Sequence, residues 1–168
     1  TFFLSRNERA ATLARTEAAY SKFVPRQVLS LLRTPSIMDV ELGTHVEKEM
    51  TILFSDIREF TTLSETMTPH ENFRFINSYL SEMEPVIGRN DGIIDKYIGD
   101  AIMALFPGNA DDALAAAIEM LAQLEVYNMG RGRAGYNPVQ IGIGLNTGMV
   151  LLGTVGGLNR MDSTVISD

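Results

Sequence analysis

The amino-acid sequence predicts an α+β domain, a ferredoxin-like βαββαβ antiparallel sheet with helices on one face, preceded by a helical segment. Short apolar runs rich in β-branched residues alternate with amphipathic stretches that open on helix-capping residues. Two of the apolar runs are joined by a Gly-Asp pair alone, which is typical of a β-hairpin. These two observations predict the order of the elements.

The composition is that of an acidic globular protein. The chain has 168 residues, 45% of them hydrophobic, and a formal net charge of −7. This length allows one domain and an extension. The negative charge argues against nucleic-acid binding, which needs clustered Lys and Arg, and suits carboxylates that hold divalent cations. The sequence contains no Cys, which excludes disulfides and thiolate metal sites.

The first part of the chain, residues 1–45, is predicted to be a helical signalling and linker segment. Residues 1–33 are rich in good helix formers and are interrupted only at Pro25. A seven-residue spacing of Leu and Ala leaves a weak coiled coil open as an alternative. Residues 34–48 carry the Pro, Gly and charges of a linker. No signal peptide or membrane-length apolar run is visible, so membrane attachment is expected only through a part not present here.

The domain itself, residues 46–168, is predicted to begin with a buried strand at 50–54. A helix follows, with Thr68 as its N-cap and Glu71 as the capping-box partner. Pro85 is expected to bend or end that helix. The spacing of three and four residues predicts a buried stripe made of Phe73, Ile76, Leu80, Met83 and Ile87.

The second half is predicted to hold a hairpin, a helix and further strands. The hairpin joins strands 93–98 and 101–106 through its Gly-Asp tip. A helix capped by Asn109 or Asp111 runs to Leu124, with an acidic first turn that suits the helix dipole. After a loop, the pattern predicts separate strands at 139–145, 149–152 and from 160 onward.

Two carboxylates are expected to meet at one edge of this sheet. Asp56 follows the first strand and Asp100 lies at the hairpin tip, and these strands are neighbours in a βαββ arrangement. Carboxylate oxygens without His or Cys select hard cations, and two such ions can hold both the attacking and the leaving oxygen in phosphoryl transfer. The turn from Ile57 to Thr61 offers backbone N–H groups to a phosphate. Spacing alone leaves open that each Asp is only a turn or cap residue.

Four segments resemble, in the right order, the four signatures of the class III adenylyl and guanylyl cyclases. They cover roughly residues 46–168. One such motif would be weak evidence, whereas four in order make a specific match. The segments are FSDIREFT at 54–61, DKYIGDAIMA at 95–104, GIGLNTG at 142–148 with Gly153 and Gly156 after it, and RMDSTVI at 160–166.

The resemblance implies a metal and phosphate site. Asp56 and Asp100 would be the catalytic residues and would bind two divalent cations, Mg²⁺ or Mn²⁺, with Ile57 as the third residue of the metal site. Ile57, Phe60 and Thr61 would contact the phosphates of the substrate.

The resemblance also implies which base is read. Lys96 would donate to a ring nitrogen of adenine, and Thr164 would be the second base-reading residue, as in a bacterial subgroup of adenylyl cyclases. Guanylyl cyclases tend to carry Glu at the position of Lys96, so ATP is the expected substrate, cyclic AMP the expected product, and guanylate cyclase the alternative. The usual family pattern has Gly where this chain has Glu59, which leaves the detail of the phosphate loop open.

The resemblance further implies a head-to-tail homodimer with its sites at the interface, controlled by an upstream sensor and located in the cytoplasm. The family pattern continues past the fourth signature to an Asn and an Arg that contact the ribose and the transition state. Those residues are expected beyond Asp168, so the domain is expected to be C-terminally incomplete and the 168-residue chain alone nearly inactive.

Other interpretations of the sequence are weaker. A diguanylate cyclase would need a Gly-Gly-Asp/Glu-Glu-Phe hairpin that is absent here. The glycines from Gly142 to Gly153 lack the strand–helix context of a dinucleotide-binding fold. A non-catalytic dimerisation or signalling module of the same fold is opposed by the retention of Asp56, Lys96, Asp100 and Thr164.

Overall fold

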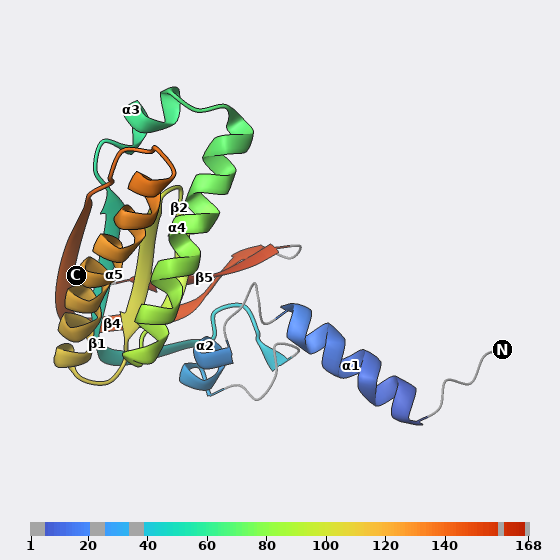
Figure 1. Cartoon of the computed structure of the whole chain (residues 1–168). Helices are drawn as coiled ribbons and strands as arrows, with labels where there is room; N and C mark the ends of the chain where they lie inside the picture. Colours follow the sequence, from blue (N-terminus) through green and yellow to red (C-terminus); the bar gives the residue numbers. More distant parts are fainter. Residues whose placement is uncertain (1–5, 21–25, 34–38, 158–159, 167–168) are drawn as a thin grey trace.

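The computed structural model describes residues 6–20, 26–33, 39–157 and 160–166, and α1 extends away from the sheet (Figure 1). In chain order the elements are α1 (Arg6–Tyr20), α2 (Arg26–Leu31), β1 (His45–Ile57), α3 (Phe60–Glu65), α4 (Pro69–Arg89), β2 (Ile93–Ile98), β3 (Ala101–Phe106), α5 (Ala110–Arg133), β4 (Ile141–Gly157) and β5 (Arg160–Ile166).

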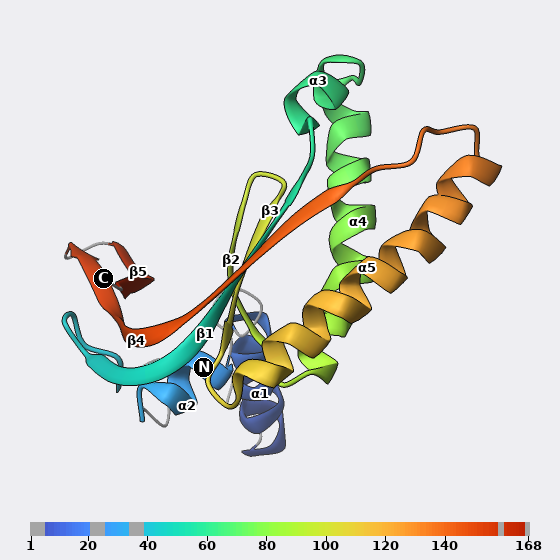
Figure 2. The same cartoon turned by 90° about the vertical axis from the view of Figure 1, so that its left-hand side faces the viewer.

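The five strands form one antiparallel sheet in the order β2-β3-β1-β4-β5. In this order β3 lies beside β1, as the sequence predicts for the hairpin and the first strand. The long strands β1 and β4 are paired over the whole length of β1 and curl together (Figure 2). The predicted α+β fold with its antiparallel sheet is therefore confirmed, and β5 extends the sheet at the edge beside β4.

One face of the sheet is covered by α4 and α5, and both helices begin at a capping box. The Thr68 hydroxyl accepts from the Glu71 N–H at 3.3 Å, and the Glu71 carboxylate accepts from the Thr68 N–H at 2.8 Å. Asn109 and Asp112 form the same reciprocal pair at the start of α5. Each cap satisfies N–H groups that have no partner inside the helix. The predicted caps at Thr68 and Asn109 are confirmed.

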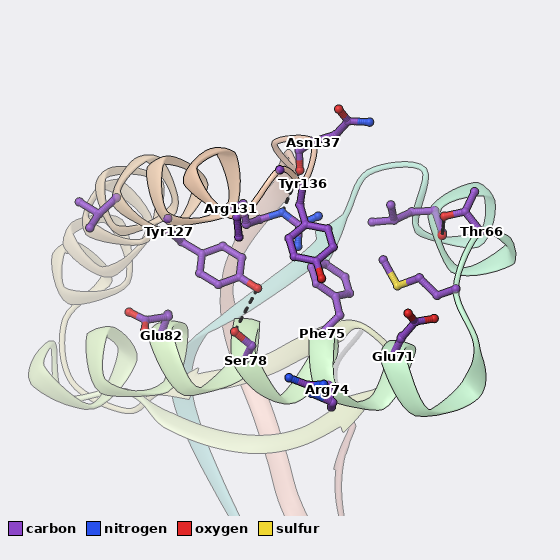
Figure 3. A pocket seen from close by; sticks show the side chains of 16 residues that line it. Thr66, Glu71, Arg74, Phe75, Ser78, Glu82, Tyr127, Arg131, Tyr136 and Asn137 are labelled. Carbon is purple, nitrogen blue, oxygen red and sulfur yellow. Dashed lines mark hydrogen bonds between the residues drawn. The ribbon is translucent and has the colours of Figure 1, made fainter.

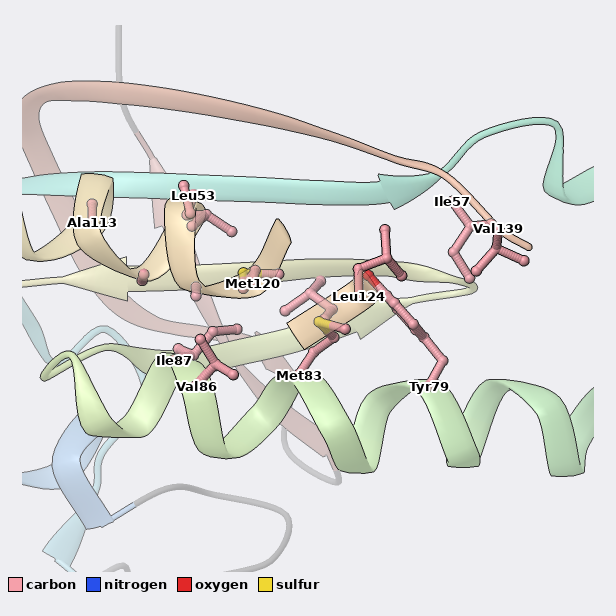
Figure 4. Packing of buried hydrophobic residues seen from close by; sticks show 14 of the residues in the cluster. Leu53, Ile57, Tyr79, Met83, Val86, Ile87, Ala113, Met120, Leu124 and Val139 are labelled. Atoms are coloured by element: carbon pink, nitrogen blue, oxygen red, sulfur yellow. The ribbon is translucent and has the colours of Figure 1, made fainter. Parts of the chain in front are cut away.

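The main core lies between these two helices and the sheet (Figure 4). The alternation of β1 places every second residue against the helices, while α4 and α5 contribute residues three or four positions apart. Burying a side chain of this size stabilises the fold by roughly 1.5–3 kcal/mol. The fully buried members include Leu53, Tyr79, Met83, Ile87, Ile102 and Met120.

The opposite face of the sheet is covered at one end only. Val28 and Leu32 are buried against it, where α2 and the turn after it pack on the sheet. The sheet residues of this second cluster include Met50, Ile52, Met103, Leu105, Val150 and Leu152. The predicted helical character before the domain is thus confirmed for α1 and α2, whereas Pro25 and residues 34–38 of the predicted linker lie outside the described residues.

The predicted stripe of α4 is partly wrong. Phe73 is 72% exposed, while Tyr79, which the stripe omitted, is completely buried. Met83 and Ile87 are buried as predicted, and Ile76 and Leu80 are half-buried beside the core. The error is one of phase, because Phe75, Tyr79 and Met83 also follow a spacing of four and compete for the same face. The helix also continues through Pro85 to Arg89.

The predicted strand boundaries are wrong at two places. Residues 141–145 and 149–152 of the two predicted strands are parts of the single strand β4, and residues 45–48 of the predicted linker belong to β1. The two errors have one cause, since the extended pairing runs from His45 opposite Gly153 to Ile57 opposite Ile141. Each strand supplies hydrogen-bond partners to the other, so both remain extended across positions where glycines or charged residues would disfavour a strand. None of the helices among the described residues is both long and apolar enough to span a membrane.

Candidate active site

Asp56 and Asp100 come together at one end of the sheet. Asp56 is the penultimate residue of β1, and Asp100 lies in the β2–β3 turn, where Gly99 adopts the left-handed backbone that this turn requires (φ 64°). The N–H of Ile57 donates to Oδ2 of Asp100 at 3.0 Å. Because Ile57 directly follows Asp56, this hydrogen bond holds the second carboxylate beside the end of the first strand.

The buried hydroxyl of Tyr79 lies beside the same pair. It is 3.4 Å from the hydroxyl of Ser55, the residue before Asp56. Burial raises the pKa of Tyr79, the hydrogen bond with Ser55 lowers it, and the negative charges of Asp100 and Asp56 raise it further. The phenol of Tyr79 is thus within the electrostatic influence of both carboxylates. The sequence did not identify Tyr79 as a neighbour of the site, because the predicted buried stripe of α4 omitted it.

The donor chemistry of this pair fits a divalent cation. Among the described residues, no group of three or more His, Cys, Asp or Glu side chains gathers in a way that could enclose a metal. Mg²⁺ does not need such a cage, because proteins usually bind it through one or two carboxylates together with water and substrate phosphates. Asp56 is exposed and Asp100 is half-buried, so both are accessible to such a shared arrangement.

Lys96 is a residue of the edge strand β2, and its side chain lies against β5, the strand at the opposite edge of the sheet. Its ammonium donates to the carbonyl oxygen of Ser163 at 2.9 Å, next to the half-buried Thr164. Strands β2 and β5 are the two edge strands, so this contact depends on the curl of the sheet. The structure therefore places Lys96 against the residue that precedes Thr164, the second residue that the resemblance assigns to base reading.

Asp95 completes this second cluster and was not among the residues predicted for the site. Its side chain is fully buried, with Oδ2 3.4 Å from the Lys96 ammonium and Oδ1 accepting from the Ser163 hydroxyl at 3.4 Å. Burial raises the pKa of Asp95, and Lys96 and Ser163 lower it. An irregularity in the β2–β3 register falls between Ile94 and Lys96, and it allows two successive side chains to reach the same strand. No sequence signal marks such a bulge.

The turn after Asp56 has an unusual backbone. Glu59 is in the left-handed region (φ 55°) and gives α3 no side-chain cap. Only Gly adopts this conformation without a steric cost, which accounts for the Gly of the family pattern at this position. Phe60 then begins α3 and stacks on Phe75 with ring centroids 6.4 Å apart, while Thr61 is exposed. Any phosphate contact from Phe60 would therefore come from its backbone.

The two clusters remain separate within one chain. In the described part of the chain, no hydrogen bond or ion pair links Asp56 or Asp100 to Lys96 or Thr164. The carboxylate pair lies at the end of β1 and the hairpin tip, whereas Lys96 lies on β2 and its ammonium reaches β5.

Comparison with known proteins agrees with this geometry. Residues 43–163 match the model of the protein family described as "Adenylate and Guanylate cyclase catalytic domain". The chain belongs to this family. Divalent-metal dependence is general in it, as the donor chemistry of the carboxylate pair leads one to expect.

Several relatives of the cyclase domain are close. The chain is 47% identical over 161 residues to an adenylate cyclase of Anabaena cylindrica, covering 93% of this chain and 32% of that protein. It matches a bacterial light-regulated adenylyl cyclase structure with a TM-score of 0.79 and 28% identity, over 96% of this chain and 48% of that one. The guanylyl cyclase Cya2 gives a TM-score of 0.67 and 36% identity, over 75% and 66%. The chain thus spans about a third of the Anabaena relative.

Proposed function

We propose that this chain is the catalytic domain of an adenylate cyclase, which converts ATP to 3′,5′-cyclic AMP and pyrophosphate. The observation that carries the proposal is the Lys96 ammonium held 2.9 Å from the Ser163 carbonyl, beside Thr164. The 47% identity to the Anabaena adenylate cyclase supports the same activity.

The choice of base follows from hydrogen-bond polarity. An ammonium only donates, and adenine offers an acceptor at its ring nitrogen N1, where guanine carries a hydrogen. Lys96 would therefore favour ATP, with the Thr164 hydroxyl adapting to the exocyclic amine. Guanylate cyclase stays the second candidate because the Cya2 domain is 36% identical.

The reaction is an intramolecular phosphoryl transfer. The ribose 3′-hydroxyl attacks the α-phosphorus, the bond from that phosphorus to the bridging oxygen breaks, and pyrophosphate leaves. Divalent ions held by Asp56 and Asp100, together with the backbone carbonyl of Ile57, would lower the pKa of the attacking hydroxyl and neutralise charge on the phosphates. The chain's own contribution is to align the attacking and leaving oxygens.

The turn after Asp56 would hold the phosphates. Glu59 leaves the first turn of α3 without a side-chain cap, so the N–H groups of Phe60 and Thr61 are open to an anion. The N–H of Ile57 is already engaged by Asp100, and its place in the turn would serve mainly to orient that carboxylate.

The active form would be a head-to-tail homodimer, in which the carboxylate pair of one protomer faces Lys96 and Thr164 of its partner. The separation of the two clusters within one chain supports this arrangement. Phe54 and Ile98 support it as well, because they are 45% and 52% exposed on the sheet face that α2 leaves uncovered.

Residues 1–45 would form the signalling segment and residues 46–168 the cytoplasmic catalytic domain. Val28 and Leu32 pack on the same sheet face that carries Lys96, so a movement of this segment would reach the nucleotide site. An upstream sensor would act through it by changing how the two protomers meet.

The test is the formation of cyclic nucleotides from ATP and, separately, GTP with Mn²⁺ by the protein that carries this domain. We expect cyclic AMP to dominate, to disappear in Asp56→Ala, and to rise faster than linearly with protein concentration. Lys96→Glu should shift the preference toward GTP. Predominant cyclic GMP would favour the guanylate cyclase. No product from a folded dimer would favour a non-catalytic signalling module.

A further inference from the structure

A cavity of about 690 Å³ lies away from the proposed active site, between α4 and the C-terminal end of α5 (Figure 3). Its walls come from α3, α4, α5 and the loop that leads to β4. None of Asp56, Asp100, Lys96 or Thr164 lines it. The volume falls within the range of roughly 300–1,000 Å³ that is typical of small-molecule sites.

A buried guanidinium lies in this cavity. Arg131, in the last turn of α5, is only 8% exposed. Its guanidinium carbon lies 4.7 Å from the ring centre of Phe75, 5.9 Å from that of Tyr127 and 5.5 Å from that of Tyr136. Figure 3 shows the side chain among these three rings. The positive charge is thus surrounded by aromatic faces, which attract a cation.

The hydrogen-bonding capacity of Arg131 is mostly unused. Its Nε donates to the carbonyl oxygen of Asn137 at 2.8 Å. Within the described ranges of the chain, no carboxylate lies within ion-pair distance of it. A guanidinium carries five N–H donors, so four remain on the two terminal nitrogens. A buried charge without a counter-charge is costly, and aromatic faces offset only part of that cost.

We propose that this cavity binds a small organic carboxylate with a flat, apolar body. The carboxylate would accept two parallel hydrogen bonds from the terminal nitrogens of Arg131, the geometry that a guanidinium matches best. The body would lie against Phe75, Tyr136 and Met67, which line the same cavity.

The other charges of the lining select a monoanion. Glu71 and Glu82 also line the cavity, together with Arg74. Glu71 is held in the capping box with Thr68, and Glu82 accepts from Gln123 at 2.7 Å. The lining thus carries two carboxylates and two guanidinium groups, so it offers no excess positive charge to a phosphate dianion or a nucleotide, whereas a single carboxylate needs only the guanidinium of Arg131.

A purely structural role for Arg131 is the competing explanation. The bond to Asn137 does tie the end of α5 to the loop before β4, but it uses only Nε. A structural role predicts that removing Arg131 lowers stability and predicts no preference between an acid and its amide. The two explanations therefore differ in a binding measurement.

The experiment compares 2-naphthoate with 2-naphthamide by calorimetric titration of the protein. We expect saturable 1:1 binding of naphthoate and binding of the amide about tenfold or more weaker, as the loss of a charged hydrogen bond predicts. Arg131→Met should weaken naphthoate by a similar factor. Arg133→Met, an exposed neighbour in the same helical turn, should bind as the wild type does. Circular dichroism verifies that each variant is folded.

Arg131→Lys provides a second variant if the Met protein does not fold, since it keeps the charge and loses the paired donors. It should bind naphthoate several-fold more weakly, and the acid–amide comparison on the wild type needs no variant at all. The proposal is overturned if neither probe binds saturably, if acid and amide bind equally, or if a folded Arg131→Met protein binds naphthoate with wild-type affinity.

Discussion

The two faces of the sheet differ in how completely they are covered. The face under α4 and α5 is sealed, with Leu53, Tyr79 and Met83 completely buried. The opposite face is closed by α2 at one end, while at the other end Phe54 remains 45% exposed. Residues alternate between these faces along the strands, except at the bulge in β2, so most neighbours in sequence belong to different environments. The comparison indicates that the sealed face supplies stability, and we expect the open face and its adjoining strand ends to supply the chemistry of the proposed function.

The largest expected effect is the loss of catalytic rate when Asp100 of the carboxylate pair is changed. Asp100→Asn keeps an oxygen that can accept from the Ile57 N–H, so the fold should persist, but it removes one carboxylate charge from the proposed metal pair. We expect kcat to fall by about a hundredfold or more, because charge stabilisation by metal ions contributes several kcal/mol. Steady-state cyclic AMP formation measures this.

Asp91→Asn is the matched control, since Asp91 is an exposed turn residue before β2. It should leave kcat unchanged. A normal kcat in Asp100→Asn would break the assignment of the chemistry to this end of the sheet.

The next effect tests the sealed face. Met83→Ala should lower the free energy of unfolding by about 2–5 kcal/mol, since truncating a fully buried side chain leaves a cavity. Urea unfolding measures this. Phe73→Ala on the same helix removes a side chain that is 72% exposed and should change stability by less than about 0.5 kcal/mol. Similar losses of unfolding free energy in both variants would contradict the observation that α4 buries Met83 and exposes Phe73.

A smaller effect should separate positioning from stability at Asp95. In Asp95→Asn, Lys96 loses its buried counter-charge, so kcat/KM for ATP should fall by about tenfold, and the advantage of ATP over GTP should shrink. Burial is the main influence on Asp95 and raises its pKa, so the charged form is disfavoured in the fold. A carboxyl with a raised pKa contributes stability below its ordinary pKa and loses it as the pH rises through the raised value.

The neutral Asn should therefore preserve or increase stability near pH 7, as thermal unfolding would report. Glu84 is an exposed carboxylate on α4, so Glu84→Gln should change neither the preference for ATP over GTP nor the thermal stability. If the Asp95→Asn protein discriminates between ATP and GTP as the wild type does, Asp95 does not position Lys96.

The smallest effect concerns the turn that joins the two regions. Glu59→Gly should relieve the left-handed backbone at φ 55°. The relief is on the order of 1–2 kcal/mol, and the greater freedom of Gly in the unfolded chain offsets about half of it. Chemical unfolding should show a gain of under about 1 kcal/mol. A loss of stability would mean that the Glu59 side chain makes a stabilising contribution larger than the backbone strain.

Much of the site follows from local pattern. The apolar run before Asp56 and the Gly-Asp hairpin tip predict two strands, and the βαββ order makes those strands neighbours. The meeting of Asp56 and Asp100 could therefore be predicted from the sequence. The phase of α4 could not, because Phe73 and Tyr79 lie on two overlapping apolar stripes and only packing against α5 and the sheet chooses between them.

The sequence by itself determined the element types, the capping boxes and the carboxylate pair, because each depends on residues near one another in the chain or on a simple strand order. Only the tertiary structure decided that Lys96 reaches β5, that a bulge turns Asp95 toward the same strand, and that Arg131 is buried among three rings. Those contacts depend on the curl of the sheet and on the approach of α5 to α4. Both result from packing summed over the whole domain, which no local segment encodes.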